Sequence, residues 1–384
     1  MKIVREFEKI FADECDCFDE LSKFVEAGEY LSLGWQRGRG AFVQAKNFVG
    51  VIHLPSGFQI EILPKLDAPE KNLRALVVKM IRALKNFAGK DFLEADLDTA
   101  HLPLYEIFIR NYLEMVSALV KRGLKSSYIL REENLNFFKG KLLVGHHVRK
   151  NFAHREKFFA AFDEYSLDRP EHRLIKATLD KLLYTTRDPK NFRRANRLLA
   201  DFDSVEQSFN FAADFAAAST DRLNRDYKIV MAWTKIFLAE KSFTAFAGRA
   251  RAAALLFAME KLFEAYVAAH VKNFFADRNV KIQAQEKFLF DAPKEFGLKP
   301  DIILDDGKII MDTKWKLKIS AGDMYQMFTY AKRYGAEKIF LLCPPNADGE
   351  KFYRAEDFSV QIFFVDLFDM DLRMKKLRDE INRR

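Results

Sequence analysis

The sequence predicts a multidomain α+β protein built from three successive parts. Short apolar runs separated by turn residues fill residues 1–66, a pattern typical of a small β-rich module. Apolar residues at helical spacing dominate residues 67–248, so we expect a mostly helical region with a few strands. Residues 249–384 carry helical and β-type segments in the order α-β-β-β-α-β, which predicts an α/β domain with a mixed sheet.

Size and composition indicate a folded, soluble protein. The chain has 384 residues, 49% of them apolar, and no low-complexity tract, which is enough for two or three domains with substantial cores. No apolar run approaches the roughly 20 residues that a membrane helix needs. The N-terminus lacks the apolar core of a signal peptide. We therefore expect a cytoplasmic protein with no membrane contact.

The net charge and the cysteine content indicate the kind of partner and the cellular compartment. The formal net charge of +8 and the isoelectric point near 9.1 suit a polyanionic partner. The three cysteines, Cys15, Cys17 and Cys343, cannot form a disulfide framework. Cys15 and Cys17 are also too close in sequence for a conventional zinc half-site. A reducing compartment fits this pattern.

The N-terminal module is expected to contain one helix and several strands. The helix covers residues 13–27 and ends at Gly28, and a turn at 55–57 joins the last two strands. Residues 34–40 read as a flexible loop that carries Trp35 and two arginines. This loop could contact phosphates or a partner protein, or it could be an ordinary surface hairpin loop. The expected strands are 2–7, 30–33, 42–45, 47–54 and 58–63.

The central region is expected to be mostly helical, interrupted by two or three strands. Pro69 and Pro103 each stand at the start of a helical pattern, and Gly123 follows the second one. The stretch 146–157 and the arginines of 193–197 are basic and could grip phosphates, although solvated faces explain both equally well. The expected helices are 69–87, 103–121, 171–185, 190–200 and 222–239, and the expected strands are 127–131, 141–147 and 158–165.

The C-terminal domain is expected to open with one long helix over residues 249–276, in which Leu255 and Leu256 lie on a buried stripe. A second helix is expected at 321–334. The expected strands are 281–290, 301–305, 308–315, 338–343 and 360–366.

Two acidic residues are predicted to face each other in this domain. Asp306-Gly307 lies between two apolar runs, which is a strong signal for a hairpin with a type I′ turn. A two-residue loop places Asp301 opposite Asp312, with Lys314 on the same face. Carboxylates across a ladder are about 5 Å apart and repel each other. A divalent cation such as Mg²⁺ would make the arrangement favourable, whereas an ordinary hairpin tip with scattered charge is the alternative.

The residues Pro300-Asp301 and Asp312-Thr313-Lys314 resemble the PD-(D/E)xK pattern of metal-dependent nucleases. Gln326 and Tyr330 resemble the QxxxY element that follows the lysine strand in RecB-like nucleases. Glu264 stands in a segment that resembles the first helix of the same fold, where a glutamate often completes the metal site. Glu260 lies one turn earlier and is the alternative.

Nearly the whole chain resembles the McrC family, the nuclease subunits of McrBC modification-dependent restriction systems. One apparent departure from the family is Glu171-His172, where an asparagine-arginine pair is expected. The segments that carry the resemblance are Val49-Gly-Val51, Ile60-Glu-Ile-Leu-Pro-Lys65, Lys139-Gly-Lys-Leu142, Phe162-Asp-Glu-Tyr-Ser-Leu-Asp-Arg-Pro170, Phe263-Glu-Ala-Tyr-Val267, Met311-Asp-Thr-Lys-Trp-Lys316 and Asp323-Met-Tyr-Gln-Met-Phe-Thr-Tyr-Ala331.

The resemblance implies a restriction endonuclease subunit that hydrolyses DNA phosphodiester bonds with Mg²⁺, or with Mn²⁺ in its place. The implied metal ligands are Asp301, Asp312, Glu264 and the carbonyl of Thr313. The implied catalytic residues are Asp301, Asp312, Lys314 and Gln326.

The resemblance also implies two partners: modified double-stranded DNA, and a hexameric AAA+ NTPase of the McrB type that hydrolyses GTP or ATP. The chain itself has no Gly-x-x-x-x-Gly-Lys-Ser/Thr loop, so we expect no nucleotide site on it. Two other readings stay open. The chain could be a catalytically inactive activator of the motor, or a nuclease that acts without one.

Overall fold

The computed structural model describes residues 1–26, 30–54, 56–84, 101–218, 225–239, 253–316, 318–345 and 349–383. Contacts divide the chain into two compact units, one made of Met1–Leu104 with Ser242–Arg384 and the other of Tyr105–Lys241. Parts of the first and third predicted segments therefore belong to one unit. The predicted boundaries at residues 66 and 248 stay a prediction, and residue 248 lies outside the described residues.

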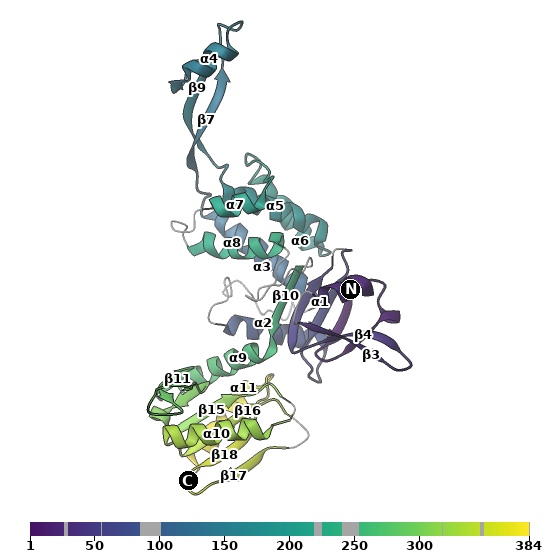
Figure 1. Ribbon diagram of the computed structural model, residues 1–384, viewed down its shortest axis with the longest axis vertical. Coiled ribbons are helices and arrows are strands. Elements are labelled where there is room, and N and C mark those ends of the chain that lie inside the picture. Colours follow the sequence, from purple (N-terminus) through teal and green to yellow (C-terminus); the bar gives the residue numbers. More distant parts are fainter. Residues whose placement is uncertain are drawn as a thin grey trace. The chain divides into compact units, whose positions relative to one another are not determined.

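The N-terminal part of the first unit contains two sheets (Figure 1). Its core combines residues from both sheets and from helix α1 (Phe18–Glu26), among them Leu21, Val43 and Ile60. The four-stranded sheet has the order β1 (Lys2–Arg5), β6 (Gln59–Leu63), β5 (Phe48–His53) and β10 (Ala253–Ala258), and the three-stranded sheet has the order β2 (Lys9–Phe11), β4 (Gly40–Ala45) and β3 (Leu31–Gln36).

The predicted long helix 249–276 is wrong in its first part. Residues 253–258 form strand β10, which pairs with β5, and helix α9 covers only Met259–Phe274. Leu255 and Leu256 therefore belong to a strand. A six-residue apolar run does not distinguish a buried strand from a buried helix, and the pairing partner lies about 200 residues away in sequence.

The predicted flexible loop 34–40 is also wrong, because most of it is a hairpin. Gln36 pairs with Gly40, which leaves only residues 37–39 in the turn. Arg39 forms an ion pair with Glu14 at 2.8 Å and lies over the Phe11 ring, 3.9 Å from its centroid. Trp35 is 70% exposed. The surface hairpin is thus the alternative that the structure supports.

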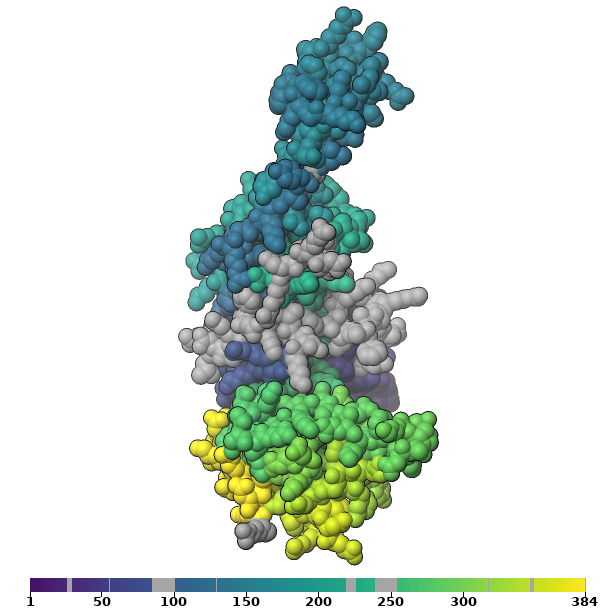
Figure 2. Space-filling view, turned by 90° about the vertical axis from the view of Figure 1, so that its left-hand side faces the viewer, coloured from purple at the N-terminus to yellow at the C-terminus, as the bar shows by residue number. Residues whose placement is uncertain are grey.

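The second unit packs helices around buried aromatic residues such as Trp233, Tyr112 and Phe202. Strands β7 (Ser127–Leu135) and β9 (Phe158–Ser166) form a long antiparallel hairpin that stands away from the helices of this unit, and Figure 2 shows it as a narrow projection. The helices are α3 (Leu104–Lys121), α5 (Pro170–Thr185), α6 (Pro189–Ala200), α7 (Phe211–Ala217) and α8 (Arg225–Ala239).

The predicted strand 141–147 is wrong beyond its first two residues. Lys141–Leu142 form the short strand β8, and Val144–Lys150 form helix α4 near the far end of the hairpin. The His146 ring stacks on Phe159, and Lys150 lies over the same ring. These contacts with β9 stabilise a helix that the local sequence does not signal.

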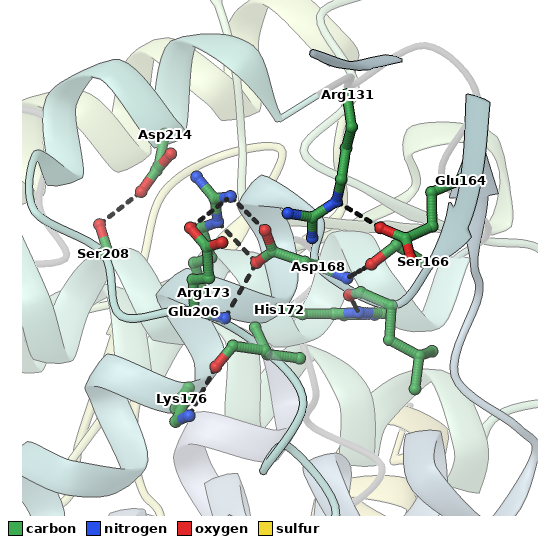
Figure 3. Close-up of polar contacts among 12 residues, drawn as sticks. Arg131, Glu164, Ser166, Asp168, His172, Arg173, Lys176, Glu206, Ser208 and Asp214 are labelled. Carbon is green, nitrogen blue, oxygen red and sulfur yellow. Dashed lines mark hydrogen bonds and ion pairs between the residues drawn. The ribbon is translucent and has the colours of Figure 1, made fainter. Parts of the chain in front are cut away.

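A polar network fixes the base of the hairpin (Figure 3). Asp168 follows β9 and accepts hydrogen bonds from Arg173 Nε at 2.7 Å and from the backbone N–H of Glu206 at 3.0 Å. His172 is fully buried, its Nδ1 lies 2.6 Å from the Leu167 carbonyl, and its Nε2 lies 2.8 Å from the Tyr227 hydroxyl. Burial lowers the pKa of His172. His172, in the Glu171-His172 pair that departs from the family pattern, therefore has a structural role.

The C-terminal part of the first unit is a six-stranded mixed sheet, which confirms the predicted mixed sheet. Helix α10 (Ala321–Tyr334) covers one face, where Met327 and Tyr330 pack on Ile310 and Leu341. Helix α11 (Met370–Asn382) follows the last strand and contacts α9. The strand order is β11 (Val280–Ile282), β14 (Ile302–Leu304), β15 (Ile309–Thr313), β16 (Lys338–Cys343), β18 (Ser359–Phe364) and β17 (Lys351–Arg354).

The predicted strand 281–290 is wrong as one element. It contributes β11 to the main sheet and β12 (Lys287–Phe288) to a separate two-stranded ribbon with β13 (Gly297–Leu298). The backbone turns between the two at Gln283, whose φ is 52°. No described helix is both long and apolar enough to span a bilayer.

Candidate active site

The β14–β15 hairpin has the predicted register, but its connection is longer than the predicted two-residue loop, because Asp305 also has a positive φ, of 50°, and the strands stop at Leu304 and Ile309. Asp306 and Gly307 have φ of 56° and 101°, and the Lys308 N–H donates to the Asp305 carbonyl at 3.3 Å, as in a type I′ turn. Ile302 pairs with Met311 and Leu304 with Ile309. Continued by one residue, this register places Asp301 opposite Asp312, as predicted.

Asp301 and Asp312 are both held at the open end of the hairpin. Asp301 Oδ2 accepts hydrogen bonds from the Thr313 N–H at 2.7 Å and from the Thr313 hydroxyl at 2.6 Å. Asp312 is only 2% exposed. Lys314 Nζ lies 2.5 Å from Asp312 Oδ2 as an ion pair, but this oxygen has no well-aligned hydrogen bond among the described residues.

Burial disfavours charge on both acids. It raises the pKa of Asp301 to about 7, and the charge of Asp312 adds to the shift. The pKa of Asp312 is also raised by burial, against the opposing charge of Lys314. Burial alone would lower the pKa of Lys314, yet the charges of Asp312 and Asp301 outweigh it and raise that pKa. Lys314 is therefore an ammonium ion at neutral pH.

Glu264, on α9, is close enough to the two acids to interact with them electrostatically. It is 9% exposed, accepts a hydrogen bond from Lys261 at 2.9 Å and contacts the amide of Gln283. Its charge contributes to the raised pKa values of Asp301 and Asp312. Glu260, the alternative, is exposed and lines a separate cavity. Of the two glutamates, Glu264 is the one near the acid pair.

Gln326 and Tyr330 lie one helical turn apart on α10 and bond to each other, with Gln326 Nε2 donating to the Tyr330 hydroxyl at 2.7 Å. Tyr330 is buried, and burial together with the charge of Asp312 raises its pKa. Tyr330 is therefore near the acid pair. Among the described residues, Gln326 forms no hydrogen bond with either acid, so the structure connects it to the site through Tyr330.

The acids do not converge on one point in the described part of the chain. No group of three His, Cys, Asp or Glu residues there is arranged to hold a metal ion. Asp301 is turned to Thr313, and Glu264 to Lys261 and Gln283. The donor chemistry nevertheless suits a hard cation, because two neighbouring carboxyl groups have raised pKa values and one Asp312 oxygen lacks an aligned hydrogen bond. A role for the Thr313 carbonyl rests on the resemblance alone.

Sequence reasoning missed several neighbours of the site. Asp323 is buried, bonds Lys316 at 2.9 Å and adds its charge to the environment of Asp312. It forms a capping box with Ser320, and the Ser-x-x-Asp spacing is a signal that could have found it. Lys261 lies three residues before Glu264 and could have been found by helical spacing. Gln283 follows an edge strand and carries no such signal.

The model of the McrBC 5-methylcytosine restriction system component family matches residues 43–344. The chain belongs to this family. No curated protein gave a significant match.

Two solved structures are similar to the chain. One is a chain of the refined half-complex from the tetradecameric assembly of Thermococcus gammatolerans McrB AAA+ hexamers with bound McrC. It is 18% identical, with a TM-score of 0.70 over 99% of each chain. The other is a chain of the McrBC complex of the same organism, 18% identical, with a TM-score of 0.51 over 71% of this chain and 88% of that one. At this identity the likeness establishes the fold, which is that of the family.

Proposed function

We propose that the chain is the endonuclease subunit of a modification-dependent restriction complex. It would hydrolyse phosphodiester bonds of modified double-stranded DNA. The observation that carries the proposal is the acid pair of the half-buried Asp301 and the buried Asp312, with Lys314, at the end of the β14–β15 hairpin, in a chain of the McrBC family. Fold alone would not suffice, because one fold supports many activities.

A Mg²⁺ ion, or Mn²⁺ in its place, would act as a Lewis acid that polarises a water and neutralises phosphate charge. Asp301 and Asp312 would hold it, with Glu264 and the Thr313 carbonyl as further ligands. Lys314 carries a proton, so it would donate hydrogen bonds to the phosphate or orient the attacking water rather than serve as a free base. Gln326 would support the site by fixing the Tyr330 hydroxyl.

A second part of the proposal concerns the partner. The similar T. gammatolerans chain comes from an assembly of McrB AAA+ hexamers with bound McrC, and it matches this chain over 99% of both lengths. We propose that this chain likewise binds an AAA+ hexamer of the McrB type. This sequence lacks a phosphate-binding loop of its own, so the hydrolysis of GTP or ATP would take place on that partner.

The deciding experiment measures DNA cutting with Mg²⁺ by the chain alone and with a candidate AAA+ partner plus GTP or ATP. Asp312→Ala should abolish cutting yet leave partner binding and nucleotide turnover intact. If Asp312→Ala cuts like the wild type, the site assignment is wrong. Cutting without any partner would favour the stand-alone nuclease, and stimulation of the partner without any cutting would favour the inactive activator.

A further inference from the structure

An aromatic ribbon precedes the candidate active site by a few residues in the sequence. We use this name for residues 287–298, which comprise β12, β13 and the loop between them. Phe290 and Phe296 are 54% and 67% exposed, and their rings meet edge to face with centroids 6.2 Å apart. Phe296 also has a φ of 55°, a conformation that is uncommon for a bulky residue. Folding alone gives no reason to present two paired phenyl rings to water.

The ribbon is anchored to the nuclease fold. Arg333, near the end of α10, donates from Nε to the Phe288 carbonyl at 2.8 Å and pairs with Asp291 at 2.5 Å. The Tyr334 hydroxyl donates to the Leu298 carbonyl at 3.2 Å. The Leu289 N–H donates to the Phe296 carbonyl at 3.0 Å, which closes the ribbon. The two rings are thus presented on a fixed support.

Charge around the rings favours a polyanion. Lys287, Lys294 and Lys299 are exposed, and none forms an ion pair with a residue that the structure describes. Of the two acids in the ribbon, Asp291 is paired with Arg333 and only Glu295 is left. Lysines of this kind bind DNA phosphates through their charge. A purely apolar protein partner would gain little from them.

The ribbon is also within reach of a substrate at the acid pair. Five residues separate Phe296 from Asp301. A chain spans at most about 3.6 Å per residue, so their Cα atoms are within about 18 Å of each other. This is about the length of five base pairs, since a strand advances about 3.4 Å per base. A duplex cut at the acid pair is therefore long enough to reach the ribbon.

We propose that the aromatic ribbon wedges Phe290 and Phe296 between base steps of duplex DNA, from the minor groove, close to the cleaved phosphate. Apolar side chains that enter the minor groove unstack a base step and bend the duplex. Lys287 and Lys294 contact the phosphates on either side. The inference rests on the proposed nuclease function, because that function brings a duplex to this edge of the domain.

The test compares the full-length wild type with the double variant Phe290→Ala/Phe296→Ala. The matched control is Phe352→Ala, which removes a ring that is 63% exposed on β17, the edge strand of the six-stranded sheet that is farthest from β11 in strand order. The probes are duplexes that carry one 2-aminopurine at successive positions within about five base pairs of the mapped cut site. Binding is measured in Ca²⁺ in place of Mg²⁺ to keep the DNA intact. All three rings are exposed, so thermal unfolding should be unchanged in both variants.

The wild type and the Phe352→Ala control should raise the 2-aminopurine fluorescence at one or two positions. The double variant should show no rise and should bind about tenfold more weakly or worse, in line with the loss of aromatic–base contacts. Lys294→Ala should lower the slope of log affinity against log salt by about one, without a change in the position of the fluorescence rise.

Two results would overturn the wedge: an unchanged fluorescence rise and affinity in the double variant, or no rise at any position with the wild type. If the double variant loses binding to the AAA+ partner but keeps its DNA affinity, the ribbon is a protein-docking surface instead. Cutting in Mg²⁺ with the partner is measured in parallel. If the wild type does not cut in this assay, the nuclease proposal fails. If the wild type cuts and the double variant still unstacks DNA normally, only the wedge proposal fails.

Discussion

At Asp301 and Asp312 a half-buried and a buried carboxyl group share one nearby lysine, and among the described residues only Asp312 is ion-paired with it. The nearby Glu264 is already matched by Lys261. The acid pair therefore lacks one positive charge, and this deficit adds to the effect of burial, which is the main cause of the raised pKa values of both residues. A bound cation or a proton can supply the missing positive charge.

Lys314 should be needed for cutting because its ammonium group is the only described cation paired with Asp312. Lys314→Ala should lower the single-turnover cutting rate about 100-fold or more. Lys314→Arg keeps the charge and should recover part of the rate. Lys308→Ala, an exposed position in the turn of the same hairpin, serves as the control. Cutting by Lys314→Ala at the rate of the control would contradict the assigned role.

Glu6 should make stability depend on pH. It is 1% exposed and accepts hydrogen bonds from the Trp315 indole at 3.2 Å and the Lys65 N–H at 3.1 Å, and burial raises its pKa from 4.5 to about 7. Between these values the folded state with Glu6 binds more protons than the unfolded state, so the contribution of Glu6 to stability is greatest below pH 4.5 and falls as the pH rises to 7. The loss is on the order of 3 kcal/mol at most.

The Glu6 effect is isolated by a comparison with Glu6→Gln, which cannot ionise. We expect the stability of the wild type relative to this variant to fall between pH 4.5 and 7 and to level off above pH 7. The midpoint of chemical unfolding at each pH provides the measurement. A difference that stays constant over this range would show that the Glu6 carboxyl is not shifted.

At the scale of elements, local signals account for what could be predicted and distant partners for what could not. Asp306-Gly307 specifies a turn, and the turn in turn fixes the register that sets Asp301 opposite Asp312. Strand β10 was not predictable, because its partner β5 is remote in sequence. The contact of Gln283 with Glu264 and the helix α4 likewise depend on tertiary neighbours. The acid pair could thus be found from the sequence, whereas the residues that hold Glu264 in place could only partly be found.

The β5–β10 pairing should depend on Gly50. Its φ is 135°, and a Cβ atom there would overlap the Leu255 carbonyl oxygen. Gly50→Ala should therefore cost at least about 2 kcal/mol, from backbone strain plus the loss of close strand contact. Gly57→Ala is the control, because its φ is 80° but no atom lies within 4 Å of the added Cβ, so only about 1 kcal/mol is expected. Equal losses in the two variants, measured by chemical unfolding, would mean that the strand contact is unimportant.

At the scale of the whole molecule, the two compact units offer an internal comparison for metal binding. The acid pair belongs to the unit made of Met1–Leu104 and Ser242–Arg384, whereas the other unit contributes no residue to it. A ligand that binds a folded unit raises the stability of that unit by mass action. Multidomain chains commonly unfold in more than one transition, so the effect can be assigned to a unit.

Mg²⁺ should reverse the order of stability between the wild type and Asp301→Asn. Both hydrogen bonds from Thr313 reach the same Asp301 oxygen, so the asparagine carbonyl can accept them while the repelled charge is removed. Without metal the variant should therefore be the more stable protein, by about 1 kcal/mol. At a hundredfold excess of Mg²⁺ over its Kd, the wild type should gain about 2.7 kcal/mol and the variant almost nothing. Calorimetry with and without Mg²⁺ measures both transitions. A gain in the transition of Tyr105–Lys241, or an equal gain in wild type and variant, would place the cation away from the acid pair.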